Sequence, residues 1–156
     1  MVDRNDMNPI LFTKEKYNQI KKGYQELLIA RKEAVLHLTK AREMGDLSEN
    51  GYYRSSKSRL SSIDHSLRKL SNFIKYGSVI DFVNKGAVEI GCKVMIKENN
   101  RSQQYQIVGK EEADPKMGKI SNESPLGKLL LGKRAGESIE LKTPSGTISY
   151  KIIRIE

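Results

Sequence analysis

The stretch that decides the fold runs from Thr13 to Ala41 and reads TKEKYNQIKKGYQELLIARKEAVLHLTKA. Mostly apolar side chains recur in it at alternating steps of three and four residues, at Tyr17, Ile20, Tyr24, Leu27, Arg31, Ala34, Leu38 and Ala41. The same spacing returns further along the chain, at Tyr53, Ser56, Leu60, Ile63, Leu67, Leu70 and Ile74. This period is typical of helices that pack along a left-handed coiled-coil seam. The short connection between the two stretches makes the helices antiparallel.

The ends of this helical region also have recognisable signals. Thr13 is suited to be the N-cap of the first helix, and Gly77 is suited to end the second one. At 1.5 Å per residue, about 30 residues per helix predict an arm on the order of 40 to 45 Å long. We therefore predict a coiled-coil arm over residues 13–77 that carries, at its far end, the turn Gly45-Asp46-Leu47-Ser48-Glu49-Asn50.

Composition limits the classes of protein to which the chain can belong. The 156 residues contain one cysteine and no apolar run near the roughly 20 residues of a membrane span, so we expect a cytoplasmic protein. The formal net charge of +9 points to a polyanionic neighbour, first of all nucleic acid. Residues 50–77 hold six basic side chains, against Asp64 alone: Arg54, Lys57, Arg59, Arg68, Lys69 and Lys75. This surface is either a solvated helix face or a phosphate-contacting face.

Beyond Gly77 the pattern changes to short β-rich runs separated by turn residues. The expected strands are Ser78–Val83, Cys92–Lys97, Gln104–Val108, Ser138–Lys142 and Thr147–Ile155. A brief helix at Leu126–Leu131 is opened by Ser124 as cap and Pro125 in the first turn. We predict an α+β protein in which residues 78–156 form a small domain with a mostly antiparallel sheet. Residues 1–12 are expected to be an N-terminal extension that need not be ordered.

Few residues are candidates for chemistry. His37 and His65 fall just off the seam and Cys92 has no partner cysteine, so we expect no zinc site. The remaining candidates are Asp46 and Glu49. Their spacing is that of a capping box, in which Asp46 or Ser48 caps the second helix. The pair also suits Mg²⁺, because this ion prefers oxygen ligands such as carboxylates. Two exposed carboxylates would hold the ion only together with further ligands from a partner. Both interpretations remain open, and they are compatible.

The turn residues 45–50, followed by Tyr53 and Lys57, resemble the tip motif of the bacterial Gre transcript cleavage factors. Further blocks resemble the same family, at residues 107–114, 120–133 and 143–150. The resemblance implies a coiled-coil arm followed by an FKBP-like domain. It also implies that Asp46 helps to hold a second Mg²⁺ in the active site of RNA polymerase and that Glu49 positions or activates the attacking water. Leu47, Ser48 and Asn50 would shape the tip and contact the channel walls.

The resemblance further implies partners. The arm would enter the secondary channel of bacterial RNA polymerase beside the 3′ end of a backtracked RNA, with Arg54, Lys57 and Arg59 as candidates for contacting that RNA. Glu123, Ser124 and Pro125 would dock on the rim of the channel, unless they serve only as a turn and helix cap. The protein would act as a monomer and as an activator of the polymerase, with no cofactor of its own beyond the shared Mg²⁺.

Two other functions stay open at this stage, and so does the branch of the family that the chain resembles more. A non-catalytic binder of the same channel would inhibit polymerase, although the relatives of that kind have altered acidic tips. A plain RNA-binding coiled coil would bind RNA without affinity for polymerase. The basic run of the second helix looks closer to the GreB branch, which favours longer backtracked RNA. The C-terminal blocks look closer to GreA.

Overall fold

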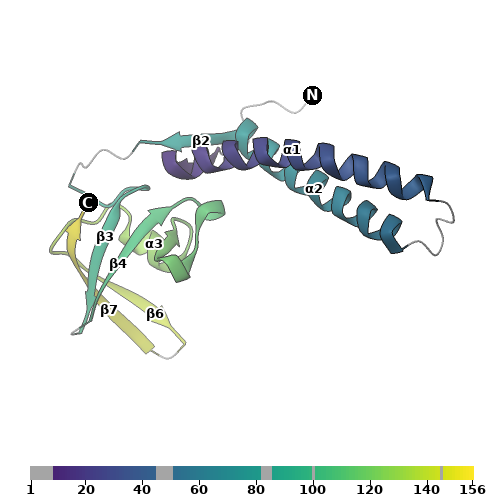
Figure 1. The fold of residues 1–156 in the computed structure, drawn as a ribbon. Helices are drawn as coiled ribbons and strands as arrows, with labels where there is room; N and C mark the ends of the chain where they lie inside the picture. The colour runs from purple at the N-terminus through teal and green to yellow at the C-terminus, as the bar shows by residue number, and fades with distance from the viewer. Residues whose placement is uncertain (1–8, 45–50, 82–85, 100, 145) are drawn as a thin grey trace, which may run out of the picture. The chain divides into compact units, whose positions relative to one another are not determined.

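The computed structural model describes residues 9–44, 51–81, 86–99, 101–144 and 146–156. The chain divides into two units (Figure 1). We call Tyr17–Tyr76 the arm, and we call the other unit, formed by Met1–Lys16 and Gly77–Glu156, the sheet unit. The predicted α+β class is therefore confirmed, with a helical hairpin followed by a β-sheet domain.

The arm consists of two long helices, α1 (Lys14–Glu43) and α2 (Gly51–Tyr76), of which the first three residues of α1 belong to the sheet unit. Three contacts between the helices give their relative direction. The Tyr17 hydroxyl donates to the Ile74 carbonyl at 3.0 Å, and His37 Nδ1 lies 2.8 Å from the Tyr52 hydroxyl. Between these two contacts, Arg31 Nε donates to Asp64 Oδ1 at 2.6 Å. Because the residue number of the partner in α2 decreases as the residue number in α1 increases, the helices are antiparallel.

The predicted seam is the face along which the helices bury their side chains. Its members are buried or half-buried, with the exception of Arg31, which is exposed and pairs with Asp64. The buried ones are Ile20, Ala34, Leu38, Ala41, Ser56 and Leu67. The heptad pattern therefore predicted which face of each helix packs.

The sheet unit is built on a five-stranded sheet with the order β5-β4-β3-β7-β6. All neighbouring pairs are antiparallel except β4 and β5, which are parallel. The strands are β3 (Lys93–Glu98), β4 (Arg101–Val108), β5 (Lys119–Ser121), β6 (Ser138–Thr143) and β7 (Gly146–Ile155). Two short 3₁₀ helices, η1 (Lys110–Glu112) and η2 (Pro115–Met117), connect β4 to β5, and α3 (Pro125–Leu130) follows β5.

A single apolar core fills the sheet unit. It is composed of Val88, Cys92, Val94, Ile96, Ile107, Ile120, Leu130, Ile139 and Ile152. Val94 and Ile96 are alternate residues of β3, and each of the other four strands supplies one isoleucine, as expected for strands with one buried face. Leu130 brings α3 onto this core and is fully buried.

The structure tests the sequence-based expectations where the chain enters and leaves the arm. Ile10–Thr13 forms strand β1, which pairs in parallel with β2 (Gly77–Ile80), so residues 10–12 are part of a sheet and not of a loose extension. The prediction that the second helix ends at Gly77 is confirmed, since α2 ends at Tyr76. Gly77 is not among the glycines with positive φ, and it begins β2 directly.

Candidate functional site

The far end of the arm lies between Glu43, where α1 ends, and Gly51, where α2 begins. The tip candidates Asp46, Leu47, Ser48, Glu49 and Asn50 are outside the described residues. What the structure establishes is the pair of helix ends that flank them. Since α1 has 30 residues, it is on the order of 45 Å long. The tip sequence is therefore joined to the end of the hairpin that is farthest from β1 and β2 along the chain.

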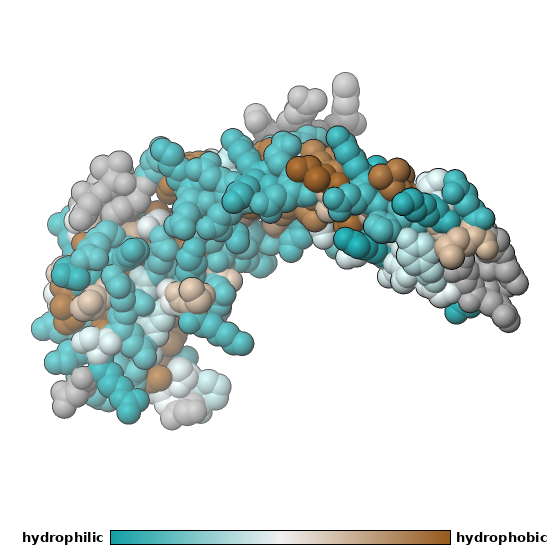
Figure 2. All heavy atoms as spheres, viewed as in Figure 1, coloured by the Kyte–Doolittle hydropathy of each residue, from teal (hydrophilic) through white to brown (hydrophobic). Residues whose placement is uncertain are grey.

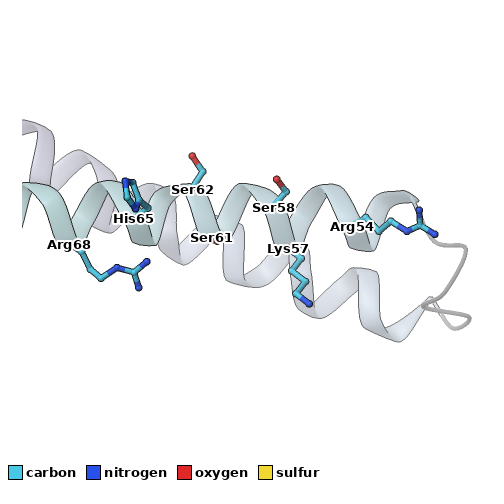
Figure 3. Close-up of a pocket in the computed structure, with 7 residues that line it drawn as sticks. All are labelled: Arg54, Lys57, Ser58, Ser61, Ser62, His65 and Arg68. Atoms are coloured by element: carbon cyan, nitrogen blue, oxygen red, sulfur yellow. The ribbon is translucent and has the colours of Figure 1, made fainter.

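The outward face of α2 is basic. A shallow groove on this face is lined by Arg54, Lys57, Ser58, Ser61, Ser62, His65 and Arg68. In Figure 3, Ser58, Ser62 and His65 point to one side of the helix, whereas Lys57 and Arg68 point to the other. The spacing of three and four residues places this face roughly opposite the seam. Cations beside hydroxyl and imidazole groups form a surface suited to phosphate oxygens.

The structure does not bring the three basic candidates together. Arg54 and Lys57 both line the groove, but Arg59 is not part of its lining. At about 100° per residue, Arg59 lies roughly 200° around the helix from Lys57. Sequence analysis counted Arg68 among the basic side chains of this helix but named neither Arg68 nor His65 as a candidate RNA contact. A helical projection from Arg54 would have found both.

The outward face of α1 has a different chemistry. Ile29 and Leu36 are 62% and 63% exposed, and their spacing places both on the side of α1 away from the seam. Figure 2 shows hydrophobic side chains, in brown, among the hydrophilic surface of the arm. The arm therefore presents an apolar line on one helix and a basic face on the other.

The docking candidates form an ordered turn between β5 and α3. The Ser124 hydroxyl accepts from Gly127 N–H at 3.1 Å and donates to the Ser121 carbonyl at 2.7 Å, so the predicted N-cap is confirmed. Pro125 occupies the first helical turn, as predicted. Gly127 is required here, because a Cβ at this position would lie 2.0 Å from the Ser121 oxygen. A rigid turn therefore holds Glu123 and Pro125 exposed at the surface.

A shallow groove borders this turn within the sheet unit. It is lined by Pro9, Leu11, Gly109, Lys110, Asn122 and Glu123. Lys110 Nζ lies 3.8 Å from Glu123 Oε2, and both side chains are largely exposed, so this ion pair leaves both charges accessible. Strand β1 thus lies next to the docking candidates, which the sequence alone did not indicate.

The remaining candidates have structural surroundings. His37 contacts the Tyr52 hydroxyl across the hairpin, in keeping with a helix-flank role. Cys92 is fully buried, and burial raises the pKa of its thiol. Among the described residues, no three His, Cys, Asp or Glu side chains are grouped closely enough to hold a metal ion. Within the same residues, no helix combines the length and the apolar character needed to cross a membrane.

Comparison with known proteins assigns both units to one class, the transcription elongation factors. The family described as "Transcription elongation factor, N-terminal" matches residues 10–79. The family described as "Transcription elongation factor, GreA/GreB, C-term" matches residues 83–156. These two matches together span the arm and the sheet unit.

Two curated relatives agree with these matches, and one solved structure is similar in fold. Transcription elongation factor GreA of Caldanaerobacter subterraneus is 39% identical over 155 residues, which cover 94% of this chain and 97% of that protein. GreA of Clostridioides difficile is 37% identical over 150 residues, covering 93% of this chain and 94% of that protein. The crystal structure of GreA factor homolog 1 of Thermus thermophilus aligns with a TM-score of 0.46 and 22% identity, over 96% of this chain and 99% of that one. The chain belongs to the GreA/GreB family of transcription elongation factors.

Proposed function

We propose that this chain stimulates bacterial RNA polymerase to cleave the 3′ end of its nascent RNA when the enzyme has backtracked or arrested. The observation that carries the proposal is the arm. Two antiparallel helices of 30 and 26 residues flank a short connection, residues 44–50, which contains Asp46 and Glu49. An arm of this length delivers two carboxylates to a site that a compact domain does not reach.

The arm would enter the secondary channel of the polymerase. Its two outward faces suit such a place, because the channel offers both protein walls and an extruded RNA strand. We assign the basic face of α2, with Arg54 and Lys57, to the phosphates of the RNA. Arg59 would act from a different side of α2. The apolar line on α1 would face the protein.

Asp46 and Glu49 would complete a Mg²⁺ site with ligands that belong to the polymerase. Their carboxylate oxygens are of the type that Mg²⁺ prefers. Asp46 would hold the ion, and Glu49 would position or activate the attacking water. The bound Mg²⁺ would supply the charge stabilisation of two-metal phosphodiester hydrolysis. On this proposal the protein is an activator in the cytoplasm and not an enzyme by itself.

The sheet unit would dock on the rim of the channel through Glu123, Ser124 and Pro125. The turn that holds them is fixed by the Ser124 cap and by the close approach of Gly127 to Ser121. A preformed docking turn loses little conformational entropy on binding. Docking also raises the effective concentration of the tip in the channel, so that weak tip contacts suffice.

The experiment is RNA cleavage by purified bacterial polymerase stalled in a backtracked state, with Mg²⁺, in the presence of the factor. We expect Asp46→Ala and Glu49→Ala each to lower the cleavage rate by at least about a hundredfold, as for loss of a group that acts only in the transition state. Both variants should still compete with the wild type for polymerase. The length of the released fragments would also distinguish a GreB-like factor, which favours longer backtracked RNA, from a GreA-like one.

Glu43→Gln is the matched control. Glu43 is an exposed carboxylate at the end of α1, and its substitution removes one negative charge while both Asp46 and Glu49 are kept. It should cleave like the wild type. Normal cleavage by the double variant of Asp46 and Glu49 would refute the proposal. Slower nucleotide addition without any cleavage would instead identify a non-catalytic channel binder. Salt-sensitive RNA binding without affinity for polymerase would identify a plain RNA-binding protein.

A further inference from the structure

Glu112 is a buried charged residue in the sheet unit, and its role is not explained by the docking turn. It is 4% exposed and belongs to the block of residues 107–114 that resembles the family and to which sequence analysis gave no function. A buried carboxylate is costly unless its oxygens are paired and hydrogen-bonded. The partners of Glu112 therefore indicate what it does.

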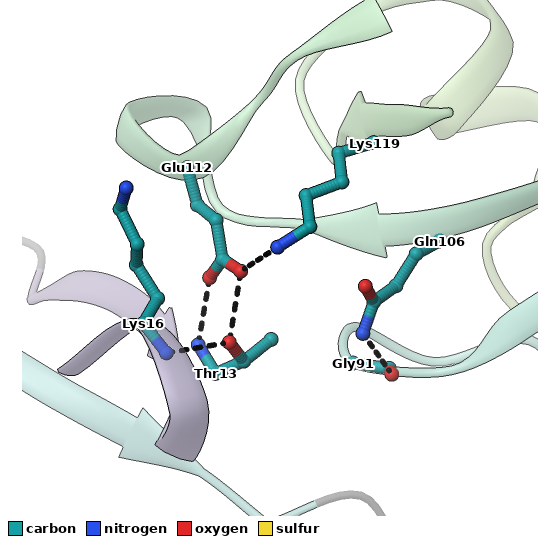
Figure 4. A network of polar contacts seen from close by, with 6 residues as sticks. All are labelled: Thr13, Lys16, Gly91, Gln106, Glu112 and Lys119. Carbon is teal, nitrogen blue, oxygen red and sulfur yellow. Dashed lines mark hydrogen bonds and ion pairs between the residues drawn. The ribbon is translucent and has the colours of Figure 1, made fainter. Parts of the chain in front are cut away.

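Three hydrogen bonds occupy both carboxylate oxygens (Figure 4). Thr13 N–H donates to Oε2 at 2.9 Å, and the Thr13 hydroxyl donates to Oε1 at 2.8 Å. Lys119 Nζ donates to Oε1 at 2.9 Å and supplies the opposite charge. Glu112 thus holds a residue that lies 99 positions away in the sequence.

Thr13 is the point at which β1 becomes α1. It is the last residue of β1, and its hydroxyl oxygen accepts from Lys16 N–H at 3.2 Å, which is the bond of a helix N-cap. The same hydroxyl therefore caps the first turn of α1 and donates to Glu112. A negative charge at this place also favours the N-terminus of the helix.

Backbone packing fixes the same segment a second time. A Cβ on Gly109 would lie 2.0 Å from the Leu11 carbonyl oxygen, so β1 rests directly on the residue that precedes η1. β1 also pairs with β2, the strand that follows α2. The two segments that enter and leave the hairpin are thus both held within the sheet unit.

We propose that Glu112 is a positioning residue for the cleavage reaction, because it holds the first turn of α1 in the sheet unit through Thr13. This inference rests on the proposed function. When the sheet unit docks, a capped and anchored helix start transmits the docked position to the arm. A frayed start would leave docking intact and would weaken the delivery of the tip.

The first test uses the free protein and does not depend on polymerase. Glu112→Gln keeps the shape but replaces one acceptor oxygen by a donor NH₂, so the two Thr13 donors can no longer both be satisfied. We expect the amides of Thr13 and Lys16 to exchange with solvent roughly tenfold faster, while amides of β3 and β7 are unchanged. Glu111→Gln, at the exposed neighbouring glutamate, is the matched control. Equal exchange in the two variants would overturn the anchor.

The second test measures cleavage by backtracked polymerase as a function of factor concentration. Glu112→Gln should lower the maximal rate at least about tenfold, and the half-saturating concentration should change less than about twofold. Thr13→Val should behave like Glu112→Gln, whereas Thr13→Ser, which keeps the hydroxyl, should behave like the wild type. A maximal rate equal to that of Glu111→Gln would overturn the positioning role. If the wild type itself fails to stimulate cleavage, the proposed function fails, and the exchange experiment still decides the anchor.

Discussion

The arm and the sheet unit are stabilised in different ways. The arm buries a narrow seam in which small side chains such as Ala34, Ala41 and Ser56 stand beside Leu38 and Leu67. The sheet unit buries a contiguous core dominated by isoleucine and valine from strands far apart in the sequence. The arm therefore depends on packing between two helices along one narrow seam, whereas the sheet unit depends on packing among several distant segments.

Cys92 offers the largest expected contrast between the two units. Its side chain is fully buried, and burial raises the pKa of the thiol, so at pH 8 it is both protected and largely protonated. We expect a disulfide reagent to label it at least about a thousandfold more slowly in the folded protein than in urea, because labelling requires opening of the core.

The control for this experiment is a cysteine on the arm. Leu36→Cys in a Cys92→Ala background places the thiol at a position that is 63% exposed. This variant should be labelled at nearly the rate of the unfolded chain. Rapid labelling of Cys92 in the folded protein would show that the sheet unit opens as readily as a surface position and would remove the contrast.

Glycine substitutions provide a second contrast, with opposite signs in the two units. Gly127→Ala drives a Cβ against the Ser121 carbonyl, which already accepts from Ser124, and should cost at least about 2 kcal/mol. Gly23→Ala places its Cβ 3.6 Å from Leu70 Cδ1, an ordinary contact inside a helix. Removal of a helical glycine should stabilise the arm by about 0.5 to 1 kcal/mol. Urea unfolding followed by hydrogen exchange at α1 and β4 measures each effect in its own unit.

These two variants also test the docking proposal. If Gly127→Ala leaves the free energy of unfolding unchanged, the turn at residues 121–127 is not rigid. It would then not be preorganised for docking. If Gly23→Ala destabilises the arm, the helices pack more tightly at this point than the distance to Leu70 indicates. Either result would contradict the difference in packing between the units.

The sequence predicted the arm more completely than the sheet unit, for a physical reason. A helix repeats every 3.6 residues, so the seam positions from Tyr17 to Ile74 follow from local spacing alone. Strand pairing joins segments that are distant in the sequence, so the spacing of residues within one strand does not predict which strand it pairs with. The parallel pairs of β4 with β5 and of β1 with β2 were therefore not predicted, although most strands and the cap at Ser124 were.

In the candidate site, too, the features set by local spacing could be predicted and those set by contacts between distant residues could not. The common face of Arg54 and Lys57, and the separation of Arg59 from it, follow from helical geometry and could have been predicted. The partnership of Glu112 with Thr13 could not, because nothing local distinguishes Glu112 from the exposed Glu111. The roles proposed for Asp46 and Glu49 are supported by the family resemblance of the tip and by carboxylate chemistry, and both residues lie outside the described part of the chain.

The smallest expected effect concerns the ion pair in the arm. Arg31 and Asp64 are 2.6 Å apart, but their side chains are 46% and 30% exposed, so solvent screens the attraction. In a double-mutant cycle with Arg31→Leu and Asp64→Asn, we expect a coupling energy below about 1 kcal/mol that decreases further in 1 M salt.

The comparison is the pair of Lys119 and Glu112 in the sheet unit, in which the Glu112 side chain is 1% exposed. Glu112→Ala leaves the half-buried Lys119 and the Thr13 donors without their acceptor, and should cost about 3 kcal/mol or more. Urea unfolding at two salt concentrations measures both pairs. A coupling above about 1.5 kcal/mol for Arg31 and Asp64 that does not respond to salt would mean that the seam shields charges as a core does. The arm would then be stabilised by a shielded ion pair as well as by its apolar seam.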